Sequence, residues 1–252
     1  MESESLLSES ELTRYNRQII IDDWGRKGQE KLNGSTVLIA GTGGLGCPVA
    51  LYLAAAGVGK IVLVDKDEFE LSNLNRQILA WQQDIGQPKA KSVAEKLLQL
   101  NPHVQVDALK TEITEDNVND IVNDSTVVVD AMDNWAIRFL LNQECVNQEI
   151  PFVHAGIQGL YGQITTIIPG KGPCLRCILS EDPEEMATFP VVGATSGLFA
   201  MLQVMETLKL IVGFGETLEG RMLLFDGERM DYMSTEVRHR NDCPVCSHLW
   251  ES

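Results

Sequence analysis

The stretch Gly41–Gly46, GTGGLG, fits the pattern G-x-G-x-x-G and decides how the sequence around it folds. The β-branched run STVLIA at Ser35–Ala40 precedes it, and an apolar, alanine-rich segment, Leu45–Gly57, follows. This order predicts a strand, a glycine turn and a buried helix, the context that a phosphate-binding motif requires. Backbone N–H groups of glycines can approach phosphate oxygens, and the helix N-terminus adds partial positive charge. We therefore predict a nucleotide-binding turn and not a glycine-rich turn without a ligand.

Strands and helices alternate beyond the glycine turn. Lys60–Asp65 is a second buried strand, Pro88–Leu100 has helical apolar spacing, Val104–Leu109 alternates like a strand, and Thr126–Asp130 is a third apolar strand. This alternation predicts an α/β fold, a Rossmann-like, doubly wound and mostly parallel sheet. The ligand crevice of such a sheet lies at the carboxyl ends of its strands, where the sequence places polar residues at Gly41–Gly46, Asp65, Asp67 and Asp130–Asn134.

The sequence changes in character beyond Pro151. Several glycines predict a loop, and the alternating segment Gln163–Ile168 predicts an extended strand, so antiparallel strands should extend the sheet. The acidic span Ser180–Pro190 reads as an exposed crossover loop before a helix at Ser196–Val212. We expect one compact domain with three parts: an N-terminal helical arm, a nucleotide-binding half and a partner-binding half, at residues 1–30, 31–150 and 151–252.

The bulk composition excludes some classes of function. The formal net charge is -16 at pH 7 and the pI is near 4.6, so the surface should repel nucleic acid and anionic lipid. The opening residues are polar and acidic and do not resemble a signal peptide. Apolar stretches elsewhere look too short or too interrupted by glycine to span a bilayer. We expect a cytoplasmic protein that binds neither nucleic acid nor membrane.

Charged residues near the predicted crevice suggest which nucleotide binds there. Asp65 follows the glycine turn at the spacing of an acid that holds ribose hydroxyls, which first suggests NAD. Asn73, Arg76 and Lys89, however, supply more positive charge than hydride transfer needs, and suit a triphosphate that loses pyrophosphate. Asp133 could hold Mg²⁺. Taken singly, Arg76 and Lys89 would more often be solvated surface charges, but their clustering favours ATP.

Six cysteines form two pairs and two isolated residues. The two C-x-x-C pairs supply four thiolates, as a closed structural zinc site requires: Cys174, Cys177, Cys243 and Cys246. A redox pair is the competing interpretation, although redox pairs normally occur alone. Cys47 and Cys145 lie in apolar segments and are interpreted as core residues. The histidines have no partner at ligand spacing and are interpreted as ordinary structural or surface residues: His103, His154, His239 and His248.

Several segments together resemble the MoeB/ThiF/HesA family, the bacterial and archaeal relatives of the ubiquitin-activating enzymes. They are RYNRQI at 14–19, the glycine turn, DKD at 65–67, LSNLNRQ at 71–77, GQPK at 86–89 and Asp133-Asn134. The resemblance extends from about Leu12 to Cys246 and includes both cysteine pairs. It implies a homodimer that binds Mg-ATP, adenylates the terminal glycine of a ubiquitin-like, β-grasp sulfur-carrier protein ending in Gly-Gly, and releases pyrophosphate.

The resemblance also implies roles for individual residues. Asp65 would take the ribose; Asn73, Arg76 and Lys89 would face the phosphates; Asp133 would hold Mg²⁺; and Arg17 would reach the terminal phosphates from the second subunit. The implied catalytic residues are Arg17, Arg76, Lys89 and Asp133. The implied ATP-binding residues are Gly41, Gly43, Gly44, Gly46, Asp65, Asp67, Asn73, Arg76, Gln77, Lys89, Asp133 and Asn134.

One position departs from the family pattern. Many relatives have a cysteine in the crossover loop, twelve residues after the first cysteine pair, where this chain has Phe189. We therefore expect adenylation without covalent transfer to this chain, and a separate sulfur donor. The sequence also ends soon after Cys246, without the fused rhodanese domain of some relatives. Among pathways, the arm and the tail resemble the molybdopterin branch most, while thiamin and tRNA thiolation stay open.

Alternatives remain at this point. An NAD-dependent oxidoreductase would explain the glycine turn and Asp65 but leaves Arg17, Arg76, Lys89 and Asp133 without a function. A non-catalytic module that binds ubiquitin-like proteins would not need the complete set of phosphate-facing residues. Adenylation of another substrate, such as a peptide, also stays open, whereas the acidic surface disfavours tRNA.

Overall fold

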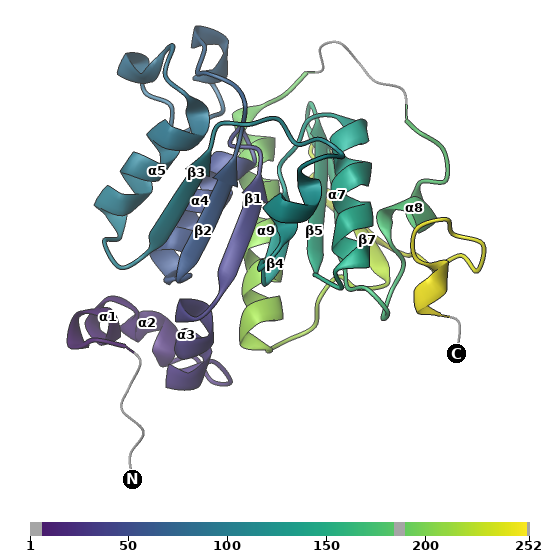
Figure 1. Ribbon diagram of the computed structural model, residues 1–252, viewed down its shortest axis with the longest axis horizontal. Coiled ribbons are helices and arrows are strands. Elements are labelled where there is room, and N and C mark those ends of the chain that lie inside the picture. The colour runs from purple at the N-terminus through teal and green to yellow at the C-terminus, as the bar shows by residue number, and fades with distance from the viewer. Residues whose placement is uncertain (1–6, 184–189, 251–252) are drawn as a thin grey trace.

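The computed structural model describes residues 7–183 and 190–250, and its centre is an eight-stranded sheet in the order β3-β2-β1-β4-β5-β6-β7-β8 (Figure 1). The prediction about Phe189, and most of the second half of the expected crossover loop, lie outside the described residues. The strands are β1 (Thr36–Ala40), β2 (Lys60–Val64), β3 (Gln105–Leu109), β4 (Val127–Asp130), β5 (Phe152–Gln158), β6 (Tyr161–Ile167), β7 (Arg221–Asp226) and β8 (Asp231–Glu236).

The first five strands are parallel and confirm the sheet expected from the sequence. Ala40 at the end of β1 pairs with Val64 of β2 on one side and with Asp130 of β4 on the other. The three strands therefore end at the same edge of the sheet. β1 and β4 are almost completely buried, because helices cover both faces of this part, and their sequences are accordingly apolar runs.

Strands β5 to β8 form the antiparallel end of the sheet. The loop expected after Pro151 is wrong: residues 152–158 form β5, which is parallel to β4 and antiparallel to β6. One of the glycines that suggested a loop has another function, since a Cβ on Gly162 of β6 would lie 2.2 Å from the ring of Phe199, which belongs to a helix packed closely on the strand. Gly159, with a φ of 60°, does lie at a turn, the one between β5 and β6.

Helices cover both faces of the sheet (Figure 1). One hydrophobic cluster joins the sheet to α3, α4, α5 and α9, and a second joins the other face to α6, α7 and α8. The α-helices are α1 (Glu9–Arg14), α2 (Asn16–Ile19), α3 (Gly25–Asn33), α4 (Gly46–Ala56), α5 (Lys89–Leu100), α6 (Val118–Val122), α7 (Trp135–Asn147), α8 (Leu175–Ile178) and α9 (Gly193–Val212), and the 3₁₀ helices are η1 (Leu71–Asn73), η2 (Gln82–Asp84) and η3 (Ser247–Leu249).

The N-terminal arm is three short helices instead of the continuous helical segment that its apolar spacing suggested. Asp23 and Gly25 have positive φ values of 67° and 59°, which interrupt the helix between α2 and α3. Tyr15 fixes the arm to the rest of the domain. Its hydroxyl accepts a hydrogen bond from Asn101 Nδ2 at 2.8 Å, and its ring packs so closely on Gly57 that there is no room for a Cβ on that residue.

The central helix α9 begins one turn before the predicted start at Ser196. It has 20 residues and is long and apolar enough to cross a membrane by length and composition, which corrects the expectation that no segment is. Its residues contact α3, α4 and strands β4, β5 and β6. A buried core helix of a globular fold passes the same test of length and hydropathy, and this packing is that of a core helix.

Candidate functional site

A cavity of about 340 Å³ opens at the carboxyl ends of β1, β2 and β4. Most of the predicted ATP-binding residues line it: Gly41, Gly43, Gly44, Asp65, Asp67, Arg76, Gln77, Lys89, Asp133 and Asn134. Gly46, Asn73 and Arg17 do not. Residues about 90 positions apart therefore meet in one place, because parallel strands bring their carboxyl ends together.

The glycine turn is packed too closely for any side chain at two of its positions. Gly41 has a φ of 93°, and a Cβ there would lie 2.6 Å from the carbonyl oxygen of Ala131. A Cβ on Gly46 would lie only 1.9 Å from the carbonyl oxygen of Gly41. Gly46 thus lets α4 start directly against β1, while Gly43 and Gly44 face the cavity, where a phosphate could approach their backbone.

Asp65 connects the end of β2 with the glycine turn. One carboxylate oxygen, Oδ2, accepts hydrogen bonds from the amide and the hydroxyl of Thr42 at 2.8 and 2.9 Å, and Oδ1 accepts the amide of Asp67 at 2.9 Å. A carboxylate has about four acceptor positions. Three bonds therefore fix the orientation of this group and leave capacity for a ligand hydroxyl in the cavity that Asp65 lines.

Two of the cationic side chains that line the cavity belong to predicted site residues, Lys89 and Arg76. Lys89, at the start of α5, is only 8% exposed, and its Nζ lies 3.4 Å from Asp67 Oδ2. Arg76 donates from Nη1 to the carbonyl of Ser72 and to Asn75 Oδ1, so its pairing within the described residues is with neutral oxygens. Lys89 is buried with one long ion pair, and Arg76 donates to neutral oxygens. Both side chains are therefore suited to bind further negative charge.

Two predicted site residues lie outside the cavity. Asn73 accepts the Glu70 amide at Oδ1 and its carbonyl accepts the amides of Arg76 and Gln77, so it shapes the turn that carries Arg76. Arg17 is exposed on α2, near the amino ends of the strands, whereas the cavity lies at their carboxyl ends (Figure 1). It cannot reach the cavity of its own chain.

Asp130, expected in the ligand crevice, is instead completely buried below it. Its Oδ2 lies 2.6 Å from His154 Nδ1 and 3.4 Å from Arg138 Nε, and its Oδ1 accepts the amide of Met132. Burial lowers the pKa of His154 although the bond to Asp130 opposes this, so the imidazole is neutral and donates from Nδ1. Asp130 therefore fixes the turn that leads to Asp133, and a ligand cannot contact it.

Other lining residues gave no signal in the sequence. Arg138, on α7, donates from Nη2 to the carbonyl of Met132 at 2.5 Å and lines the cavity with a cation that no motif marked. Two polar atoms beside the glycine turn are buried without a hydrogen-bond partner among the described residues, Gln77 Oε1 and Ser196 Oγ. The lining residues outside every quoted motif are Val64, Thr111, Glu112, Ile113, Ile137, Arg138, Ile157, Val191 and Ser196, while Leu45, Lys66, Ala131 and Met132 lie within segments that the sequence had marked.

The isolated cysteines are core residues, as the sequence suggested. Cys47 is completely buried, its Sγ donates to the carbonyl of Thr42 at 3.0 Å, and burial raises its pKa to about 12. Burial also raises the pKa of Cys145. Both are thiols at neutral pH, and neither lines the cavity.

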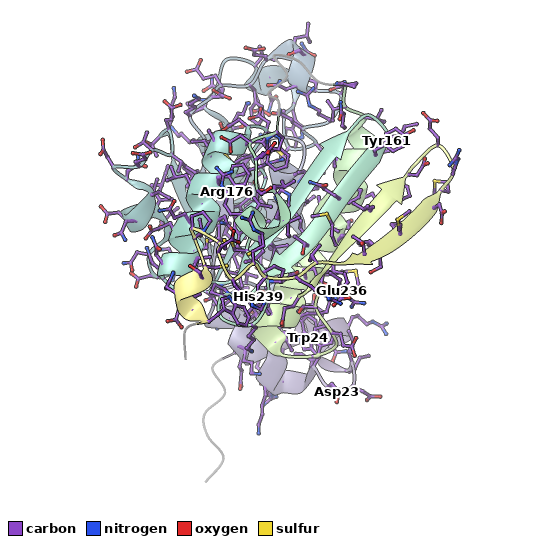
Figure 2. All side chains as sticks on the ribbon, turned by 90° about the vertical axis from the view of Figure 1, so that its right-hand side faces the viewer. Asp23, Trp24, Tyr161, Arg176, Glu236 and His239 are labelled. Carbon is purple, nitrogen blue, oxygen red and sulfur yellow. The ribbon has the colours of Figure 1, made fainter. Side chains whose placement is uncertain are left out.

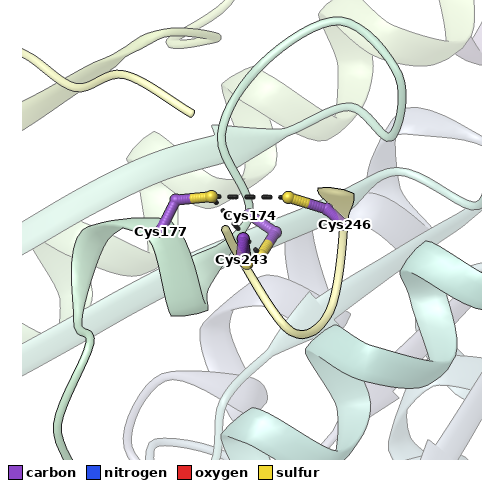
Figure 3. A group of neighbouring side chains, drawn as sticks. All are labelled: Cys174, Cys177, Cys243 and Cys246. Atoms are coloured by element: carbon purple, nitrogen blue, oxygen red, sulfur yellow. Dashed lines mark hydrogen bonds between the residues drawn. The ribbon is translucent and has the colours of Figure 1, made fainter. Parts of the chain in front are cut away.

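The four remaining cysteines form one buried cluster (Figure 3). All four sulfur atoms lie within 4.8 Å of one another, with Cys174 Sγ 3.6 Å from Cys243 Sγ and Cys177 Sγ 3.4 Å from Cys246 Sγ. A tetrahedral metal with bonds of about 2.3 Å to sulfur separates its ligands by about 3.8 Å, so this donor set fits a zinc ion. All four side chains are buried, and thiolates are the form in which cysteines bind a metal.

Comparisons with known proteins agree with this architecture. The ThiF family matches residues 15–245. This chain belongs to the ThiF family. The SAMP-activating enzyme E1 of Haloferax volcanii is 43% identical over 245 residues, which are 95% of this chain and 90% of that protein. The adenylyltransferase and sulfurtransferase MOCS3 of Culex quinquefasciatus is 42% identical over 96% of this chain but 56% of its own length.

Solved structures share the fold of this family member. The crystal structure of E. coli MccB with AMPCPP and MccA has a TM-score of 0.82 and 25% sequence identity, and covers 92% of this chain and 74% of that chain. The mixed sheet, parallel with an antiparallel end, is therefore an arrangement known from experiment.

Proposed function

We propose that this ThiF family member adenylates the C-terminal carboxylate of a small ubiquitin-like protein, using Mg-ATP and releasing pyrophosphate. The observation that carries the proposal is the single cavity that combines a glycine turn, a ribose-type carboxylate at Asp65, two cations at Arg76 and Lys89, and the acidic Asp133. The names of similar proteins support it, since one is a SAMP-activating enzyme E1 and another an adenylyltransferase.

The lining residues suggest how ATP would lie. Asp65 would accept a ribose hydroxyl, and the amides of Gly43 and Gly44 would meet the phosphates. Arg76 and Lys89 would neutralise charge on the leaving pyrophosphate, and Asp133 with Asn134 would hold Mg²⁺. Gln77 Oε1, buried and unpartnered among the described residues, would gain a partner from the bound ligand or its water.

The reaction needs no general base. One oxygen of the substrate carboxylate attacks the α-phosphorus of ATP, a new P–O bond forms, and the bond to the β-phosphate oxygen breaks. Pyrophosphate leaves with the electron pair, and the product is an acyl-adenylate. The carboxylate is already deprotonated at neutral pH, so charge neutralisation and in-line placement supply the catalysis.

We infer no covalent step on this chain. Among the described residues that line the cavity there is no cysteine, and the two isolated thiols are buried with raised pKa values. Sulfur would then come from a separate donor. The sequence position that carries a cysteine in many relatives, Phe189, lies outside the described residues, so this inference rests on the sequence there.

We propose a homodimer, and the position of Arg17 supports it. The residue is exposed at the opposite end of the strands from its own cavity, so a role at the phosphates requires a second subunit. Exposed apolar side chains support an interface on this side of the molecule: Ile20 and Ile21 after α2, Tyr52 on α4 and Met205 on α9. α4 and α9 pack against each other, which makes these helices parts of one surface.

The antiparallel end offers a surface for the protein substrate. Every residue of β8 is exposed, and apolar side chains gather at the tip of the ribbon: Leu160, Tyr161, Met230, Tyr232 and Met233. Figure 2 shows Tyr161 near this tip and Glu236 at the opposite end of β8. Exposed apolar side chains grouped in this way are typical of protein interfaces. We place the β-grasp sulfur carrier there.

Three further parts of the proposal concern the setting of the enzyme. The cysteine cluster would hold a structural Zn²⁺, because four sulfur ligands leave no open position for water. The enzyme would work in the cytoplasm, in sulfur transfer for molybdopterin, thiamin or tRNA thiolation, with the molybdopterin branch favoured by the sequence of the arm and tail. The three sequence parts, 1–30, 31–150 and 151–252, would serve as dimer arm, nucleotide site and carrier site.

The decisive experiment is Mg²⁺-dependent exchange of labelled pyrophosphate into ATP, with candidate β-grasp proteins ending in Gly-Gly. We expect exchange with the native enzyme. In Lys89→Ala and Asp133→Ala the exchange rate should fall about 100-fold or more, because removing one electrostatic contact to a transition state has an effect of that size. A carrier that lacks its last glycine is the substrate control. Binding of NAD without exchange would contradict adenylation and favour an oxidoreductase.

A further inference from the structure

Four helices of eight or more residues begin at the cavity: α4 after the glycine turn, α5 at Lys89, α7 after Asn134, and α9 (Gly193–Val212), beside which Val191 and Ser196 line the cavity. Asn134 caps α7, since its Oδ1 accepts the amide of Ile137 at 3.0 Å. The N-terminus of α9 has no such cap, because the preceding residue is Val192, whose side chain has no acceptor; α4 and α5 also lack a side-chain cap. The first amides of a helix have no acceptor inside it, so α9 directs uncompensated N–H groups outward.

A second, independent observation points to a ligand at the same place. Ser196, in the first turn of α9, is completely buried and lines the cavity, and its Oγ has no hydrogen-bond partner among the described residues. The hydroxyl lies next to the glycine turn: a Cβ on Gly44 would be 2.7 Å from Ser196 Oγ. A buried hydroxyl without a partner is destabilising unless a ligand satisfies it.

The neighbourhood of this helix end is positively charged and close to the phosphate-facing residues. A Cβ on Gly193 would lie 2.6 Å from the carbonyl oxygen of Asn75 and 3.3 Å from Cα of Arg76, so the two backbones touch. Arg138 lines the cavity as well. Val191 and Ile157, also in the lining, make this end less polar than the end at Asp65, which suits a peptide and not a sugar.

We propose that the N-terminus of α9, together with the Ser196 hydroxyl, binds the carboxylate of the protein substrate and orients it toward the α-phosphorus. This deepens the proposed function and rests on it. The 20-residue helix contributes partial positive charge at its first turn, and its free amides donate to the carboxylate oxygen that does not attack. The other oxygen is then free to form the bond to phosphorus, so α9 positions the nucleophile.

The first test gives α9 an N-terminal cap from a side chain of the protein itself. Val192 is 43% exposed, and Val192→Asp places a carboxylate where it accepts the α9 amides. The new cap competes with the substrate, so KM for the carrier in pyrophosphate exchange should rise by at least about tenfold, the size of one charge-assisted hydrogen bond, while KM for ATP changes less than about threefold. The cap should raise or maintain Tm, which separates this result from unfolding. Val192→Ala, which adds no cap, is the matched control.

Ser196→Ala provides a second readout. Removing an unpartnered buried hydroxyl should leave Tm unchanged or higher, whereas KM for the carrier should rise several-fold. A residue with a merely structural function would show the opposite, a lower Tm with unchanged KM. Unchanged carrier KM in both Val192→Asp and Ser196→Ala, with normal exchange by the native enzyme, overturns the inference and leaves adenylation intact.

A binding measurement distinguishes failure of the inference from failure of the proposed function. The amide NMR signals of residues 193–196 should shift with the dipeptide Gly-Gly, which has a free carboxylate, and not with glycylglycinamide, which has none. If the native enzyme shows no exchange with any carrier but these shifts occur, the carboxylate site stands and the adenylation proposal falls. If the dipeptide moves none of these signals, no carboxylate binds at α9.

Discussion

The parallel and antiparallel ends of the sheet are stabilised in different ways. In β1 and β4 nearly every residue is buried between two layers of helices, whereas every residue of β8 is exposed. The parallel end therefore depends on close packing of apolar side chains and glycines. The antiparallel end buries less, and the four-cysteine cluster joins α8 to the C-terminal segment around η3. Close packing fixes the atoms of the cavity, while the cysteine cluster brings α8 together with the segment that follows β8.

The largest expected effect comes from crowding the parallel end. In Gly46→Ala the new Cβ would lie 1.9 Å from the backbone oxygen of Gly41, and no flexible side chain can move away to relieve the contact. We expect a loss of more than about 5 kcal/mol in the free energy of unfolding, or no soluble protein. Gly43→Ala is the matched control, because its Cβ meets only Gln77 Nε2 at 3.7 Å, and it should cost less than about 1 kcal/mol. Urea denaturation measures both, and equal stabilities would contradict this account of the turn.

The next effect concerns the cysteine cluster. Cys243→Ser removes one sulfur ligand, and we expect a loss of about 3–5 kcal/mol in the free energy of unfolding together with loss of bound zinc. Hydrogen exchange should accelerate at α8 and residues 240–250, while the affinity for ATP changes less than about threefold, because no cysteine of the cluster lines the cavity. Zinc content by mass spectrometry is the control. A large loss of ATP affinity would show that the two ends are not separate.

The smallest expected effect is a pH dependence of the folding stability, which arises from His154 beneath the cavity. Burial, the larger effect, lowers the pKa of His154 and the hydrogen bond to Asp130 only partly opposes it, while Arg138 adds to the lowering. As pH falls through about 6.5, the unfolded state takes up a proton that the folded state refuses, so stability falls by at most about 1.4 kcal/mol per pH unit.

In His154→Asn the amide Nδ2 can keep the donor toward Asp130 Oδ2 without a titrating group. The free energy of unfolding of this variant should therefore vary less between pH 8 and pH 5.5 than that of the native protein. Denaturant unfolding at several pH values measures the difference. Identical pH profiles in the two proteins would show that folding does not change the pKa of His154, contrary to this assignment.

An element could be predicted from the sequence when the residues that form it lie close together along the chain. β1, the glycine turn and α4 were correct because apolar runs and glycine spacing act within about 20 residues of each other. β5 was missed because glycines near it suggested a loop, whereas one of them, Gly162 of β6, makes room for Phe199 of α9, a contact between distant segments. The arm was predicted as helical, but positive φ values at Asp23 and Gly25, which no spacing reveals, divided it.

The same distinction holds within the site. Asp65, Arg76 and Lys89 belong to motifs, and the cavity contains them. Asp130 looked equally suitable at the end of its strand, yet its side chain is buried against His154 and Arg138, and only the position of β5 and α7 decides that. Ser196 and Arg138 belong to no recognised pattern, because their place in the cavity depends on where two long helices begin.

The sequence by itself determined the α/β alternation, the nucleotide-type turn, the two cysteine pairs and the family. Each of these depends on residue type at short spacing, which local sterics and ligand chemistry fix. The tertiary structure decided which polar residues share the cavity, which carboxylate is buried, how the four sulfurs converge and which helix N-termini lie at the cavity. These depend on the packing of segments that are far apart along the chain, because burial and contact are properties of the folded arrangement and not of any single segment.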